Sequence, residues 1–405
     1  MAAMNLVELN IDTIPLGQPL PFALRGVAGA LLAQKGYVIR TPKELEILLA
    51  RGQTLCVDTD ESGDSFRAFK AHLQNMLMSD KPLGMISSMT MHATLAQEDA
   101  ADRERKTPHW PTWQARLTQL MRTPDPDSFL PRFENMHQGL ARHCAEAPDA
   151  TLLALVQMSA EETRHYCATH AMLVAAVCMI SARETLRWPE ERIHQIGRAG
   201  LSMNLGMGHL QDDLAQQITP LSATQAQAVE DHALRSEQML RDLGVTDEVW
   251  LQGVRGHHLR APGRLAEKTA GDQLARMIQR ADIFGARIAP RANRHPMSVT
   301  SAMQASYYDE TKSVDEAGAA LIKSLGIYPP GAWVKLASGE TAVVVRRGTT
   351  AATPKVAVLV NKEGMPTGEP IPRDTAHPNW KISAPVAQRD VRVRLPLDRL
   401  LEINC

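Results

Sequence analysis

The chain has 405 residues, of which 44% are hydrophobic and only 4% aromatic, and its formal net charge is −1. This length favours two or three domains with packed cores. So small a net charge produces no overall electrostatic field that would attract nucleic-acid polymers or membrane surfaces. No apolar run reaches membrane-spanning length, the N-terminus lacks a secretory pattern, and the five cysteines are scattered without a CxxC pair, so we expect a cytoplasmic protein with reduced thiols.

Residues 1–60 are expected to form a small mixed α/β accessory module. The apolar residues from 31 to 39 alternate around Gly36 and predict a short hairpin. Residues 41–44 combine a capping threonine, a proline at the first helical position and a glutamate that completes a capping box, which predicts the start of a helix. Gly52 is well placed to end that helix.

Residues 61–109 are interpreted as a linker. Residues 65–77 are compatible with a short helix, and residues 99–106 carry a dense run of charges. Because such runs are usually solvated, a linker explains this stretch better than a binding tail does.

Residues 110–326 form the longest helical stretch. Apolar residues recur at helical spacing around Leu152 and again around Met172, and both stripes indicate core rather than a cofactor site. Trp188 and Pro189 mark a break, after which a new helix is predicted to begin.

Residues 327–405 have a different character. Strands are predicted at residues 333–336, 341–345 and 355–360, because these short runs are rich in β-branched and other apolar residues and are separated by turn residues. We expect a small antiparallel sheet that packs on the helical region.

Five polar side chains in the helical stretch are of types that bind transition metals: His170, His232, His257, His258 and Asp282. Imidazoles suit iron, manganese or zinc, and a shared carboxylate can bridge two ions. Each residue also has an ordinary alternative: a hydrogen bond for His232, a polar surface near a helix end for the paired histidines, and an ion pair with Arg280 or Arg287 for Asp282. No Gly-rich phosphate loop, nucleophile elbow or cysteine cluster offers a competing catalytic site.

The order, spacing and flanking residues of these five side chains resemble the HD superfamily of metal-dependent phosphohydrolases, specifically its HD-GYP branch, which hydrolyses the bacterial messenger cyclic di-GMP. The resemblance covers roughly residues 150–345. It implies a mainly α fold, in which an HD-type helical domain follows a small β-containing module and precedes a small antiparallel β module. It also implies that the five side chains converge on one pocket.

The chain departs from the family pattern where that pattern has a His-Asp pair and a phosphate-binding Lys. Met203 stands for the His, Asn204 for the Asp and Met207 for the Lys, while residues 259–263 replace a Glu and the Gly-Tyr-Pro loop. A neutral amide bridges two cations poorly, and a thioether is a soft ligand that hard or borderline metals rarely choose. We therefore expect no cluster of two or three metals.

One divalent ion (Fe, Mn or Zn) could still bind at His232, His257 and His258, and the alternative is that no metal binds. The other two ligands, together with an asparagine, would form only a weak second site. Arg260 and Arg264, which follow the paired histidines, are candidate contacts for a cyclic dinucleotide.

These features predict a degenerate HD-GYP-like signalling protein without phosphodiesterase turnover. It would act by binding a cyclic dinucleotide or a signalling protein of the diguanylate cyclase type. The alternative is an active phosphohydrolase that cleaves cyclic di-GMP with an atypical metal site. Bound iron or manganese would favour the enzyme, whereas a retained cationic pocket would favour the receptor.

Overall fold

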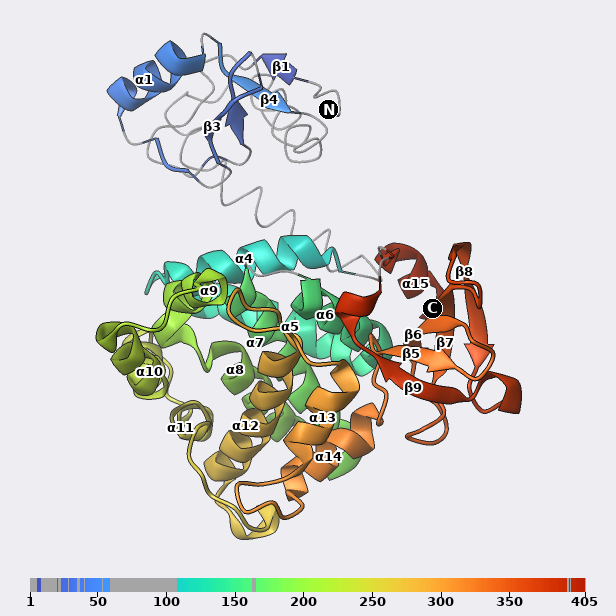
Figure 1. Cartoon of the computed structure of the whole chain (residues 1–405). Coiled ribbons are helices and arrows are strands. Elements are labelled where there is room, and N and C mark those ends of the chain that lie inside the picture. The colour runs from blue at the N-terminus through green and yellow to red at the C-terminus, as the bar shows by residue number, and fades with distance from the viewer. Residues whose placement is uncertain are drawn as a thin grey trace, which may run out of the picture. The chain divides into compact units, whose positions relative to one another are not determined.

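The computed structural model describes residues 108–391 apart from 162–164, residue 393, residues 395–404 and, in the N-terminal part, residues 6–8, 20, 23–27, 29–34, 37–39, 41–52 and 54–58. The chain forms two compact units, residues 1–106 and residues 107–405 (Figure 1). The short helix predicted at residues 65–77 and the charge run at residues 99–106 lie outside the described residues.

Within its described residues, the first unit combines one helix with an antiparallel sheet of strand order β1-β4-β2-β3. Its described elements are β1 Leu6–Glu8, β2 Leu24–Arg25, β3 Leu31–Ala33, α1 Pro42–Gly52 and β4 Cys56–Asp58. The predicted helix is confirmed, and the Thr41 hydroxyl accepts a hydrogen bond from the Glu44 amide at 3.2 Å. Strand β3 pairs with β2 across a turn where Gly29 adopts a φ of 81°. The hairpin expected around Gly36 stays a prediction. Gly36 itself lies outside the described residues.

The second unit is mainly helical, as predicted. Its helices are α4 Trp110–Arg122, α5 Phe129–Glu146, α6 Pro148–Glu161, α7 Tyr166–Ser181, α8 Glu190–Ser202, α9 Gly208–Gln216, α10 Ala223–Asp242, α11 Glu248–Gly256, α12 Ala270–Ile288, α13 Val299–Tyr307 and α14 Glu316–Leu325. Short turns of other helix types are η2 Ala182–Leu186, η3 Leu205–Met207 and η4 Leu265–Glu267. The new helix expected after Pro189 is α8, which has this proline as its N-cap.

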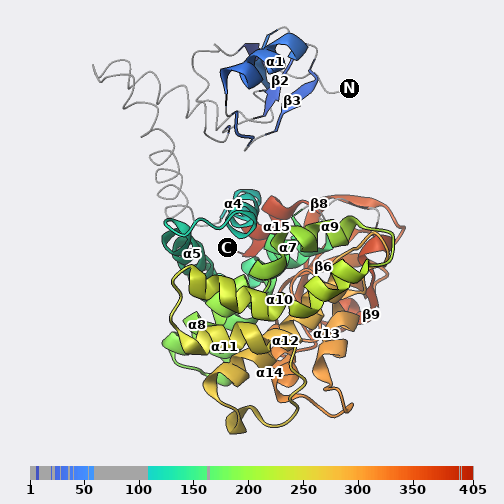
Figure 2. The same cartoon turned by 90° about the vertical axis from the view of Figure 1, so that its left-hand side faces the viewer.

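Helix α7 forms the centre of the helical core. Every one of its side chains is buried, since α6, α8 and α12 pack around it (Figures 1 and 2). A helix that is apolar on all faces belongs in such a position. Among the described residues, Tyr166–Leu186 is the one helical segment long and apolar enough to cross a membrane, and 94% of its most apolar window is buried inside the unit.

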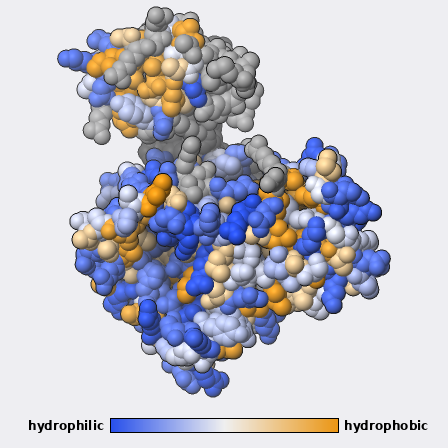
Figure 3. Space-filling model, in the orientation of Figure 1, coloured by the Kyte–Doolittle hydropathy of each residue, from blue (hydrophilic) through white to orange (hydrophobic). Residues whose placement is uncertain are grey.

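The C-terminal part is an antiparallel sheet of strand order β8-β7-β6-β5-β9. Its elements are β5 Trp333–Leu336, β6 Thr341–Arg346, β7 Lys355–Val360, β8 Pro366–Asp374, η5 Pro378–Trp380, β9 Ile382–Val386, η6 Gln388–Asp390 and α15 Leu397–Asn404. The first three strands were predicted, whereas β8, β9 and α15 were not. The sheet is joined to α6, where the Gln157 amide donates a hydrogen bond to the Gly331 carbonyl at 2.7 Å. On the face of this unit seen in Figure 3, hydrophilic residues predominate and hydrophobic residues are scattered among them.

Candidate functional site

Three histidines from two adjacent helices meet at one point. His232 lies on α10, and His257 and His258 follow the last turn of α11. The Nε2 atom of His232 lies 3.1 Å from Nε2 of His257 and 3.2 Å from Nε2 of His258. Each ring offers one nitrogen as a ligand, and these three nitrogens all lie within 4.8 Å of one another.

Helix caps fix the positions of both helices. The hydroxyl of Ser222 and the side chain of Gln225 form a reciprocal capping box at the start of α10. The Asp247 carboxylate accepts hydrogen bonds from the amides of Val249 and Trp250 at the start of α11. These caps satisfy amides that would otherwise lack partners and fix where each helix begins.

Backbone carbonyls orient two of the three rings. The Nδ1 atom of His232 lies 2.5 Å from the Val229 carbonyl, and Nδ1 of His257 lies 2.6 Å from the Val254 carbonyl. A carbonyl oxygen can only accept, so Nδ1 carries the proton in both rings and Nε2 presents its lone pair. The hydrogen bond at one ring nitrogen thus leaves the other ready for a metal, as in many metal-binding histidines.

Burial keeps these two imidazoles neutral. His257 is fully buried, and burial, aided by the nearby His258, lowers its pKa to about 3. Burial also lowers the pKa of His232. Neutral imidazole is the form that binds metals, so both rings are in the ligating form at physiological pH.

The facing nitrogens of His232 and His257 are placed so that both could bind one cation. With both Nδ1 atoms protonated and both rings neutral, neither Nε2 can donate to the other across 3.1 Å. Two ligands bound side by side to one ion at about 2.1 Å are themselves separated by about 3.0–3.4 Å. The donor set and its spacing therefore fit a divalent transition-metal ion.

The other two predicted ligands form a pair with each other. The Nε2 atom of His170 on α7 lies 2.7 Å from Oδ1 of Asp282 on α12. Burial would raise the pKa of Asp282, but the hydrogen bond to His170 and the nearby histidines hold this pKa well below its usual range. The carboxylate in turn favours the protonated form of His257, which places the pair within electrostatic reach of the three histidines. The alternative ion pair with Arg280 is not formed, because Arg280 pairs with Glu310.

The η3 turn, which follows Met203 and Asn204, packs against the turn of α10 that carries His232. The Gly206 amide donates to the Ser236 hydroxyl at 2.9 Å, and that hydroxyl donates to the His232 carbonyl at 2.7 Å. Met203 is fully buried in the apolar core. Asn204 is 2% exposed, and its Oδ1 atom has no hydrogen-bond partner among the described residues.

In the described residues, Arg260 and Arg264 form no polar contact with the histidines or with the His170–Asp282 pair. Both are exposed in the loop between α11 and α12. Neither makes a hydrogen bond or an ion pair with any residue in the described ranges.

A different group of arginines lies beside the His170–Asp282 pair, and the sequence analysis missed it. The Tyr166 ring stacks on His170 with ring centroids 5.3 Å apart, and the Arg291 guanidinium lies over Tyr166 and donates to its hydroxyl at 3.0 Å. Desolvation and the nearby charge of Arg291 lower the pKa of Arg294. The signal in the sequence was the run of arginines at positions 287, 291 and 294, shortly after Asp282.

Among the described residues, no carboxylate pairs with Arg287, Arg291 or Arg294. The Nε atom of Arg291 is buried and has no partner in this part of the chain. Guanidinium groups without carboxylate partners are well suited to phosphate oxygens.

Comparison with known proteins supports the resemblance seen in the sequence. No protein-family model matches the chain. The chain is 27% identical over 214 residues to the cyclic di-GMP phosphodiesterase PA4108 of Pseudomonas aeruginosa, a match that covers 51% of this chain and 51% of that protein. This chain therefore spans about half the length of that relative.

Among solved structures, Bd1817, a HDG"Y"P protein from Bdellovibrio bacteriovorus, is 12% identical with a TM-score of 0.39, over 78% of this chain and 98% of that one. A likeness at this level supports no conclusion. The order of the ligand-type residues, the mainly helical fold and the match to a cyclic di-GMP phosphodiesterase support the resemblance of this chain to the HD-GYP branch.

Proposed function

We propose that this chain is a cyclic di-GMP signalling protein that binds a cyclic dinucleotide beside a single metal ion and does not hydrolyse it. The proposal rests on a difference between two groups of residues: one keeps its metal-ligand types, and the other has lost two of them. In the half made by His232, His257 and His258, three ligand nitrogens lie close together, and backbone carbonyls orient two of the rings. In the other half, positions 203 and 204 hold Met and Asn.

The three histidines would hold one iron, manganese or zinc ion. When bound, that ion supplies a positive charge that can attract a phosphate oxygen. His232 and His257 are held by backbone carbonyls and kept neutral by burial, so these two ligands are pre-organised.

Arg291 and its neighbours would bind the phosphates. A cyclic dinucleotide carries two phosphodiester charges, which need cationic partners on the protein. Arg291, Arg294 and Arg287 have no carboxylate partner among the described residues, and Arg291 is joined through Tyr166 to His170. This cluster takes the role that the sequence analysis gave to Arg260 and Arg264, which remain secondary candidates.

Hydrolysis needs more than this half-site supplies. Cleaving a phosphodiester takes an activated hydroxide and charge stabilisation on both sides of an in-line displacement. Asn204, which stands where the family pattern has a carboxylate, is neutral and buried, and Met207 offers no charge to a phosphate. Binding without turnover follows.

The second candidate function is phosphohydrolysis with an atypical site. It is favoured by one observation, the 27% identity to a protein that is itself a cyclic di-GMP phosphodiesterase. Action in the cytoplasm through a protein partner of the diguanylate cyclase type is a further proposal, and it is compatible with either function.

The test measures both turnover and equilibrium binding of cyclic di-GMP on the full chain, with manganese or ferrous iron under reducing conditions. We expect no turnover and saturable binding that His257→Ala and Arg291→Ala each weaken by roughly tenfold or more, the usual scale for one charged contact. The exposed His209 provides a matched control, and His209→Ala is expected to bind like the unmodified chain.

Robust turnover that is lost in His257→Ala would establish the hydrolase instead. Neither turnover nor binding would leave recognition of a protein partner as the remaining function.

A further inference from the structure

Gln279 connects a buried ionic network to the main chain next to His258. It lies on α12 and is 6% exposed. Its Oε1 atom accepts hydrogen bonds from Arg276 Nη1 at 2.5 Å and from Arg280 Nη2 at 3.2 Å. Its Nε2 atom donates to the carbonyl of Leu259 at 3.1 Å, and Leu259 directly follows His258.

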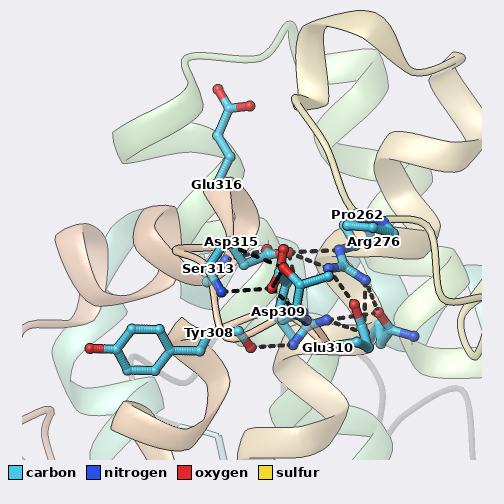
Figure 4. Close-up of polar contacts among 12 residues, drawn as sticks. Pro262, Arg276, Tyr308, Asp309, Glu310, Ser313, Asp315 and Glu316 are labelled. Atoms are coloured by element: carbon cyan, nitrogen blue, oxygen red, sulfur yellow. Dashed lines mark hydrogen bonds and ion pairs between the residues drawn. The ribbon is translucent and has the colours of Figure 1, made fainter.

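The network behind Gln279 is rigid and well paired. Arg276 makes two hydrogen bonds to Glu310, at 3.1 and 3.0 Å, and its Nε donates to Asp315 at 2.8 Å (Figure 4). Arg280 pairs with Glu310 and donates to the Tyr308 carbonyl at 2.8 Å, while the Tyr308 ring points away from the network (Figure 4). Paired guanidinium groups that are 2–3% exposed have little freedom to move, so they hold the Gln279 amide in one orientation.

His258 is the member of the histidine group that most needs such support. His232 and His257 are buried, and each donates Nδ1–H to a carbonyl of its own helix. His258 is exposed, and the described residues offer its Nδ1 no equivalent carbonyl. Its ring position therefore depends on the main chain that carries it.

That main chain is held by hydrogen bonds and not by apolar packing. The side chain of Leu259 is 62% exposed, so burial contributes little to its position. The Leu259 amide donates to the Gly256 carbonyl at 2.8 Å, and the Leu259 carbonyl accepts from Gln279. Without Gln279, only the local turn would fix the peptide after His258.

We propose that Gln279 is a positioning residue for metal binding, acting through the Leu259 peptide to hold His258 toward His232 and His257. The proposal rests on the proposed single-metal site. The side chain must accept from two guanidinium groups and donate to a carbonyl at the same time, which an amide can do. A carboxylate keeps the acceptor and loses the donor, and methionine loses both.

The experiment measures the affinity of the chelator-treated full chain for Zn²⁺ by competition with a chromophoric chelator. We expect Gln279→Met and Gln279→Glu each to weaken binding about tenfold, the lower end of the effect seen when a residue that orients a ligand is changed. The Glu variant keeps an acceptor for Arg276 and Arg280. Because its added negative charge alone would strengthen Zn²⁺ binding, weaker binding must come from the lost donor.

Gln273 on the same helix is the matched control. It accepts a hydrogen bond from Arg192 at 2.8 Å and donates to the carbonyls of Leu265 and Lys268, farther along the same loop. Gln273→Met therefore loosens the loop away from His258 and is expected to leave Zn²⁺ affinity unchanged. An equal loss in both variants would mean general loosening of the loop and would overturn the proposal.

A double-mutant cycle separates positioning from other effects. In a His258→Ala background, Gln279→Glu is expected to cause no further loss of Zn²⁺ affinity, because the ligand on which Gln279 acts is gone. Additive losses would overturn the proposal. If the unmodified chain binds Zn²⁺ and the Gln279 variants bind it equally well, the positioning role of Gln279 is wrong and the single-metal site stands. If the unmodified chain binds no Zn²⁺, both the positioning role and the single-metal site are wrong.

Discussion

At the scale of single residues, positions 203 and 204 decide how many metal ligands the site can offer. Met203 is fully buried among apolar side chains, and Asn204 is buried with an unpartnered amide oxygen in the part of the chain that the structure describes. The η3 turn that follows them lies against the His232 turn, where Gly206 approaches its backbone. The three histidines need neither residue for their own orientation.

Restoring the family residues gives a direct prediction. Met203→His with Asn204→Asp is expected to increase the number of metal ions bound per chain, because it supplies a terminal ligand and a bridging carboxylate. Without metal, the same variant should be less stable by about 1–3 kcal/mol, since polar groups enter an apolar core. Elemental analysis and melting curves with and without Mn²⁺ check both effects, and unchanged metal content would contradict the first.

The pKa of His257 predicts how stability depends on pH. In the unfolded chain this histidine has a pKa near 6.5, whereas in the folded chain its pKa is about 3. As pH falls through this window, His257 binds a proton in the unfolded state but not in the folded state. The contribution of His257 to the free energy of unfolding is therefore fully present above about pH 6.5 and is progressively lost below it. The loss approaches about 1.4 kcal/mol per pH unit for one group.

Chemical denaturation of chelator-treated protein between pH 7 and pH 5 measures this loss. His257→Gln removes the titrating group, so its stability is expected to fall less steeply over that range. Equal slopes for the two proteins would contradict the burial argument.

At the scale of secondary-structure elements, close contact between η3 and α10 fixes the position of the η3 turn. A Cβ atom at Gly206 would lie 2.9 Å from the His232 carbonyl oxygen and from the Ser236 amide nitrogen. Both are helix backbone atoms, which cannot move aside as a flexible side chain can. The glycine is therefore required for packing, whatever chemistry its neighbours have lost.

Gly206→Ala should destabilise the chain by about 1–3 kcal/mol, the usual cost of overpacking, and should weaken Zn²⁺ binding, because His232 must shift. Gly368→Ala is the matched control, since a Cβ atom there meets nothing within 4 Å. Thermal unfolding and a Zn²⁺ titration of both variants make the comparison. A Gly206→Ala chain as stable as the control would contradict this packing argument.

The elements that sequence could predict are those with local signals. Helix α1 has a capping threonine and a proline at its start, and β6 and β7 have runs of valine. Strand β8 has prolines at 366, 370 and 372, which resemble a loop in sequence and are tolerated because this strand lies at the sheet edge. The pairing of β2 with β3 was not predicted, because strands of two and three residues leave little pattern in the sequence.

At the scale of the whole molecule, the resemblance implied how the ligand-type residues would group, but not the contacts that hold each group together. The order of His170, His232 and Asp282 along the chain was enough for the resemblance. The pairing of His170 with Asp282 depends on α7 and α12 packing side by side, which brings together residues 112 positions apart. The sequence could not connect the arginines after α12 with the site, because the connection depends on the Tyr166 ring, which lies between Arg291 and His170.

The central claim is that one metal ion, and no cluster, binds at His232, His257 and His258. The most direct test is the number of metal ions per chain after reconstitution of the full protein with excess Mn²⁺ or Zn²⁺ and removal of free ions. We predict one ion per chain, lost in His257→Ala and retained in His209→Ala. Two or more ions per chain, or one ion that persists in His257→Ala, would contradict this account.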